Sequence, residues 1–128
     1  MATEEQEAAT RLAKSVIARL GESVYLRRKT ARIGAWTPAV HYCHDNVAYW
    51  VARNPQHKHV YGFIYFDLRP ITGCIRLSAH SAVEIEDGTL CDITPHDATG
   101  DYPFIRHLGT EDEFAVIAKL THIDVRAQ

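Results

Sequence analysis

The chain has 128 residues, of which 46% are apolar and 23% are charged, with a formal net charge of −2. This composition is typical of a globular protein with a core of its own, so we expect residues 1–128 to form one domain. The charge balance argues against nucleic-acid binding, and no apolar run approaches the roughly 20 residues of a membrane span.

The N-terminal segment begins with an amphipathic helix pattern over residues 3–20. Thr3 can cap this helix together with Gln6, and apolar residues recur at helical spacing behind them. The acidic start of the segment is unlike a signal peptide, which predicts a cytoplasmic protein. Residues 23–28 could form a short strand, and residues 29–42 have the composition of a loop.

The middle of the chain predicts a second helix and a long strand. The helix is expected over about 43–53, because Pro55 prevents its continuation. Residues 59–67 are rich in aromatic and β-branched side chains, which favours a buried strand. Residues 96–103 are expected to form a loop, and residues 114–125 fit either a strand or a short helix.

Asp87–Gly88 is a strong hairpin signal, and the hydrophobic pattern favours one of two possible registers. A two-residue loop mixes Asp92 with apolar neighbours on one face. A three-residue loop ending at Gly88 places Asp92 opposite Ala82 and diagonal to His80, within reach of a hydrogen bond. The same register collects an apolar face made of Val83, Ile85, Cys91 and Ile93.

The order of these elements predicts an α+β fold, in which the N-terminal helix and a cysteine-bearing helix pack on an antiparallel sheet. Cys43 opens the second helix, where the helix dipole and unpaired N–H groups favour a thiolate. His80 and Asp92 lie on one face of the hairpin. The three side chains therefore fit the roles of nucleophile, base and orienting carboxylate.

The segments that carry these residues resemble the papain-like cysteine hydrolase superfamily, in particular its NlpC-type and CHAP-type amidases. The matching segments are YCHDNVAYWV, SAHSAVEIEDG and TLCDITP. They are also similar to a group of small bacterial and phage proteins with a CHxN…AHSV…DG-L-D-TP pattern. The resemblance implies a papain-like fold and a catalytic triad of Cys43, His80 and Asp92, acting without a cofactor.

Other polar residues near these motifs are candidates for binding substrate or an oxyanion. His44 could be a second acid–base group or a helix cap, and Asn46 could orient an amide or bond local backbone. His96 could replace Asp92, and His41 could line the same cleft. Further interpretations place His57 and His59 in solvent, Cys74 and Cys91 in core strands, and Trp36 and Trp50 in the core or a cleft wall.

The leading hypothesis is a small thiol hydrolase or acyltransferase acting on an amide, thioester or isopeptide-like bond in a small-molecule or peptide-like substrate. The first alternative is a zinc or iron site built from Cys43 and the histidines around it, although standard zinc spacings are missing. The second is a non-catalytic ligand-binding or interaction domain with structural histidines. Neither nucleic acid nor a membrane is an expected partner.

Overall fold

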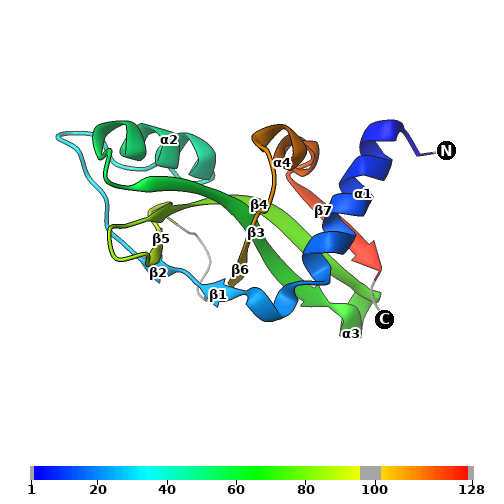
Figure 1. Ribbon diagram of the computed structural model, residues 1–128. Coiled ribbons are helices and arrows are strands. Elements are labelled where there is room, and N and C mark those ends of the chain that lie inside the picture. The colour runs from blue at the N-terminus through cyan, green and yellow to red at the C-terminus, as the bar shows by residue number, and fades with distance from the viewer. Residues whose placement is uncertain (1, 96–101, 127–128) are drawn as a thin grey trace.

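The computed structural model describes residues 2–95 and 102–126, and these residues form a mixed α+β structure (Figure 1). Helices lie against a mostly antiparallel sheet. In chain order the elements are α1 Glu4–Ile17, a 3-10 turn Leu20–Glu22, β1 Val24–Tyr25, β2 Arg27–Arg28, α2 Cys43–Arg53, β3 Lys58–Leu68, α3 Arg69–Thr72, β4 Cys74–Glu84, β5 Leu90–Asp92, β6 Pro103–Arg106, α4 Glu111–Ala118 and β7 His122–Arg126.

Helix α1 begins where its capping signal predicts. The side chain of Thr3 accepts from the Gln6 backbone, and the Gln6 side chain accepts from the Thr3 backbone, so two N–H groups of the first turn are satisfied. Ala9, Ala13 and Val16 are buried against the sheet and α4. α1 therefore contributes its apolar face to the core. It ends at Ile17, three residues before the predicted end.

The strands described form one seven-stranded sheet in the order β1-β6-β3-β4-β5-β2, with β7 on the other part of β4. The weak strand predicted over 23–28 is two short strands separated only by Leu26. They pair with opposite ends of the sheet, β1 with β6 and β2 with β5. The sheet consequently curves until it is nearly closed.

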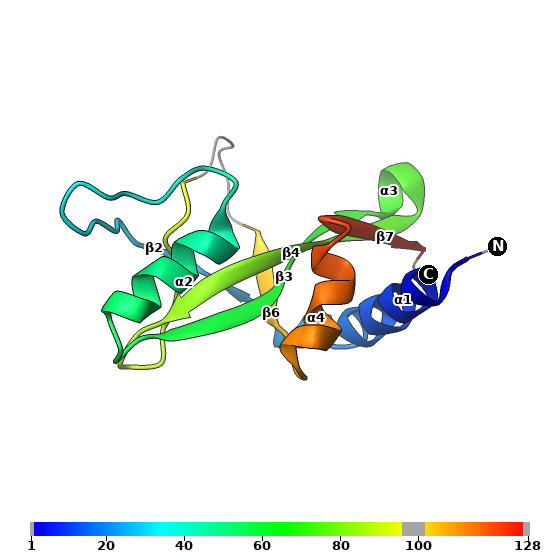
Figure 2. The same ribbon diagram turned by 90° about the horizontal axis from the view of Figure 1, so that it is seen from above.

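Long antiparallel pairing of β3 with β4 forms the centre of the sheet, and the helices cover one side of it. Figures 1 and 2 show α2 and α4 along the same side of this strand pair, with α1 beside α4. Alternation along the strands explains the arrangement, because odd-numbered side chains face these helices. Phe63 and Leu77 pack against α1 and α4, whereas Val83 packs against α2.

The β4–β5 hairpin has the three-residue register predicted from its hydrophobic pattern. Val83 pairs with Cys91, and Ile85 donates its N–H to the Thr89 carbonyl. Gly88 has a left-handed backbone with φ of 87°, which glycine adopts at low cost. Asp92 therefore lies on the same face as Ala82 and His80, as expected.

Two regions differ from the sequence interpretation. Residues 114–125 hold the end of α4 and most of β7, so both of the alternatives considered for this segment occur. Pro103 opens β6 instead of ending a loop, and residues 96–101 lie outside the described residues. Within the described ranges, no helix combines the length and apolarity that crossing a bilayer requires.

Candidate active site

Cys43 is the first residue of α2, as the sequence predicts, and its side chain is partly buried. The preceding Tyr42 supplies no side-chain cap to this helix. Backbone N–H groups of the first helical turn lack partners within the helix and form an electropositive end. The sulfur thus lies beside backbone donors that could bind a developing negative charge.

His80 and Asp92 meet behind the sulfur, and both are buried, with 5% and 7% of their surface exposed. His80 Nε2 lies 3.3 Å from Asp92 Oδ1. The ring lines the same cleft as Cys43, and a hydrogen bond and charge from Cys43 contribute to raising the pKa of His80. Asp92 is held in turn by the Thr94 N–H, 3.1 Å from Oδ1. The structure therefore brings together the three residues predicted to form a triad, in the predicted order.

The protonation of this group favours a thiolate–imidazolium pair. Burial raises the pKa of the Cys43 thiol, but hydrogen bonds and charge from His44 and His80 outweigh it, and the pKa falls from 9.0 to about 6. Burial lowers the pKa of His80, but Asp92 and Cys43 outweigh it and raise the value from 6.5 to about 9. Both groups are charged between these two values.

A second imidazole also lowers the pKa of the Cys43 thiol, through a hydrogen bond and charge from His44. The Nδ1 of His44 lies 2.6 Å from Ser81 Oγ. His59 Nε2 lies 2.8 Å from the same hydroxyl, and Ser81 is fully buried. Burial, helped by the charge of His44, lowers the pKa of His59 to about 4, so this ring is neutral at higher pH.

The Ser81 hydroxyl links the tautomers of the two rings because it carries only one hydrogen. The hydroxyl can donate to one ring and must accept from the other, so the tautomer of one ring constrains that of the other. Ser81 thereby connects His59 on β3 to His44 on α2, the residue that follows Cys43.

Ser81 and His80 are consecutive on β4 and point to opposite faces of the sheet, yet both reach the same sulfur through the contacts above. The pairing of β4 explains how. Along one edge β7 pairs with residues 74–78 and β5 pairs with 83–84. Of the described strands, neither covers residues 80–82 on this edge. The N-terminus of α2 lies at this gap. Cys43 and His44 there interact with His80 on one face of the sheet and with Ser81 on the other.

A cleft of about 560 Å³ opens at the sulfur and includes Cys43, His44 and His80 in its lining. His41 and Thr121 also line it, and they are the non-glycine residues with left-handed backbones in the described parts of the chain, with φ of 68° and 63°. Such conformations are costly for ordinary residues and gather at functional sites. The remaining lining residues are Ile64, Phe66, Ser78, Ala79, Thr94, Pro95, Tyr102 and Ala118.

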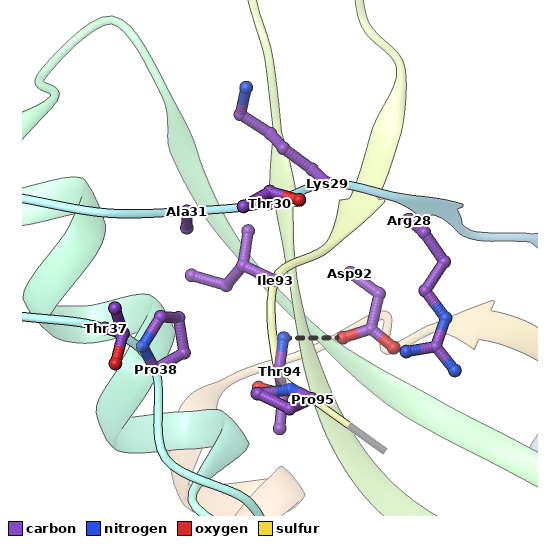
Figure 3. A pocket seen from close by; sticks show the side chains of 10 residues that line it. All are labelled: Arg28, Lys29, Thr30, Ala31, Thr37, Pro38, Asp92, Ile93, Thr94 and Pro95. Atoms are coloured by element: carbon purple, nitrogen blue, oxygen red, sulfur yellow. Dashed lines mark hydrogen bonds between the residues drawn. The ribbon is translucent and has the colours of Figure 1, made fainter.

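Asp92 lines a second hollow of about 370 Å³, which shares Thr94 and Pro95 with this cleft (Figure 3). Figure 3 shows the Arg28 guanidinium beside the Asp92 carboxylate and the hydrogen bond from the Thr94 N–H. Arg28 lies there because β2 pairs in parallel with β5, in a register that places Arg28 beside Asp92. The carboxylate thus contacts His80 and the Thr94 N–H, and Arg28 occupies the neighbouring register position on β2.

The Asn46 side chain makes structural hydrogen bonds and does not take the oxyanion role considered above. Its Nδ2 donates to the Ala39 carbonyl at 2.8 Å and to Thr94 Oγ1 at 3.0 Å, and its Oδ1 accepts from the Ala39 N–H at 3.0 Å. Asn46 therefore ties the start of α2 to the end of the hairpin, as its local-bonding alternative predicts. His96 lies outside the described residues.

The prediction that His57 and His59 face solvent is wrong. His57 is 8% exposed and accepts from Trp50 Nε1 at 2.9 Å, while its Nε2 lies 2.7 Å from Glu86. His59 binds Ser81 and stacks on Tyr61, with ring centroids 4.1 Å apart. The nearby loop suggested exposure, but the partners of both histidines lie on other parts of the chain, which the local sequence does not reveal. Of the remaining interpretations, Trp50 and Cys91 are buried, whereas Trp36 and Cys74 are only partly covered.

Ser81 and His59 are the residues that sequence reasoning missed. Ser81 follows the candidate base His80, and strand alternation directs it to the opposite face, so nothing local linked it to the thiol. In residues 2–95 and 102–126, no group of three or more His, Cys, Asp or Glu side chains could hold a metal ion. Comparison with protein-family models, curated proteins and solved structures found no match to the chain.

Proposed function

We propose that the protein is a small thiol hydrolase or acyltransferase of papain-like type, in which Cys43 is the nucleophile, His80 the acid–base group and Asp92 its orienting partner. The observation that carries the proposal is that Cys43, at the first turn of α2, and His80 line one cleft, with Asp92 Oδ1 3.3 Å from His80 Nε2. Buried thiol–imidazole–carboxylate arrangements are typical of covalent acyl transfer. The cytoplasmic location stays a prediction.

In the first half-reaction the Cys43 thiolate attacks the carbonyl carbon, and the sulfur–carbon bond forms while the carbonyl electron pair moves onto oxygen. Backbone N–H groups at the start of α2 are placed to bind this oxyanion. The oxyanion then collapses, and the bond to the leaving amine, thiol or alcohol breaks. The His80 imidazolium gives that leaving group its proton, which leaves an acyl thioester on Cys43.

In the second half-reaction the neutral His80 takes a proton from water or from another nucleophile as it attacks the thioester. The carbon–sulfur bond breaks, the acid or the transferred acyl product leaves, and the thiolate–imidazolium pair is restored. Asp92 keeps His80 oriented and stabilises its charge. Ser81 and His59 act as positioning residues because they constrain the tautomer of His44.

Acylation of the intact protein by an activated ester tests this proposal, with the adduct located by peptide mass spectrometry. We expect an acyl adduct on Cys43 that is absent from Cys43→Ser and retained in Cys74→Ser, which removes another partly accessible thiol. Equal acylation of Cys43→Ser would contradict the assignment. Elemental analysis of the same preparation separates this function from the metal-binding alternative.

A further inference from the structure

We propose that the acyl group taken by Cys43 is uncharged and apolar, an aliphatic or aromatic chain that lies along Ile64, Phe66 and Tyr102. This inference rests on the proposed function and names its substrate class. Ile64, Phe66 and Tyr102 form an apolar wall of the cleft that contains Cys43.

The wall is built from one face of β3 and from the residue that precedes β6. Ile64 and Phe66 are two residues apart on β3 and so point the same way. The rings of Phe66 and Tyr102 pack together with centroids 4.4 Å apart. Pro95 and Ala118 extend the apolar surface at other parts of the cleft. A continuous apolar wall is therefore available to a bound chain.

The register of β3 and β4 determines how far each residue of this wall lies from His80. Gly62 pairs with His80, and Ile64 pairs with Ser78, so Ile64 is the diagonal neighbour of the proposed acid–base residue. Diagonal neighbours lie about 7 Å apart, and Phe66 lies roughly 13 Å along the strand from the position opposite His80. A linear acyl group with its carbonyl at Cys43 would thus pass Ile64 before reaching Phe66.

The described lining of the cleft disfavours ionic substituents on the acyl group. Among the residues described, its ionisable groups are Cys43, three histidines and Tyr102. A carboxylate or ammonium on the acyl chain would lose water beside Phe66, and Arg76, the cross-strand partner of Phe66, is already paired with Asp124. The hydroxyls of Ser78 and Thr121 can satisfy uncharged polar atoms near the carbonyl end.

Three p-nitrophenyl esters of equal chain length test the inference on the full-length protein: octanoate, the suberate half-ester and 8-aminooctanoate, with acetate as the short reference. In each case the thiolate forms a sulfur–carbon bond and p-nitrophenolate leaves with the electron pair. A methylene buried from water is worth about fourfold in rate. We expect octanoate to acylate Cys43 at least about tenfold faster than acetate and than either charged ester.

The variant Phe66→Arg should reverse the preference between octanoate and suberate, because it places a cation on the wall. Ile71→Arg is the matched control, since Ile71 is 82% exposed in α3 and lies outside the cleft. If circular dichroism shows Phe66→Arg to be unfolded, Phe66→Gln should lower the octanoate rate by a larger factor than the acetate rate.

Equal rates for the octanoate and suberate esters, with Cys43 still acylated, would overturn the substrate class and leave the thiol chemistry standing. Failure of every ester to acylate Cys43, while the thiol still reacts with iodoacetamide, would overturn the proposed function and this inference with it. An octanoate preference unchanged in both Phe66 variants would also refute the role of this wall in binding the acyl chain.

Discussion

Replacing His80 by glutamine tests whether neighbouring rings activate the Cys43 thiol. Hydrogen bonds and charge from His44 and His80 outweigh burial and hold the pKa of Cys43 at about 6. Glutamine keeps a side chain able to hydrogen-bond but cannot carry the positive charge. Because burial remains in the variant, we expect the pKa to return toward 9.0.

The size of the effect depends on pH and changes sign. At pH 5 the thiolate fraction is about 0.1 for a pKa of 6 and about 0.0001 for a pKa of 9. The thiolate of higher pKa is the better nucleophile, by roughly 20-fold over three pKa units. For a full return to 9, the variant would react about 40-fold more slowly than the wild type at pH 5 and about tenfold faster at pH 9, with the profiles crossing at about pH 8. Because His44 remains in the variant, these factors are upper limits.

Exchange with an aromatic disulfide such as 2,2′-dithiodipyridine measures both profiles. The measurement belongs in a Cys74→Ser background, in which Cys91 is buried and burial raises the pKa of its thiol, so that Cys43 dominates the reaction. The added Cys43→Ser change gives the blank. A wild-type midpoint near 9, or two profiles that do not cross, would refute the thiolate–imidazolium pair.

Substitutions at three further positions test other parts of the site and its scaffold. Asp92→Asn can still accept from the Thr94 N–H but loses its charge, so the pKa of His80 should fall and the alkaline limit of the acylation rate, expected at about 9, should move to lower pH. Ser81→Ala should raise the midpoint for thiol exchange because His44 loses its partner, and Ser81→Thr should restore it if the hydroxyl matters. Gly62→Ala should lower the melting temperature by several degrees, because its Cβ would lie 2.4 Å from the Ile105 carbonyl oxygen and the Phe104 ring; an unchanged melting curve would show that these neighbours move aside.

Local patterns were enough to predict the elements that carry the proposed triad. The limits of α2 follow from Cys43 and Pro55, and structure and prediction agree on residues 43–53. The hairpin register followed from the alternation of apolar residues, because a slip by one residue would bury Asp92 in the apolar set. His80 and Asp92 could therefore be paired from sequence, since both belong to one hairpin.

The rest of the site depends on contacts between distant segments. His44 and Ser81 are 37 residues apart, and His59 reaches Ser81 from 22 residues away on another strand. No periodicity links such residues, and the position of His59 beside a loop suggested solvent exposure. Strand β6 was missed for a related reason, because Pro103 signals a loop but is tolerated as the first residue of a strand.

The gap in the pairing of β4 connects the fold to the chemistry. Consecutive strand residues point to opposite faces, so a sulfur above either face could meet His80 or the Ser81–His44 pair, but not both. A sulfur at the uncovered edge can meet both, since β7 ends its pairing at Ser78 and β5 begins at Val83. Extending either strand across this edge would satisfy the backbone of β4 and displace the start of α2. The unpaired edge thus leaves room for two imidazoles near one thiol, and their hydrogen bonds and charges outweigh the effect of burial on the pKa of Cys43.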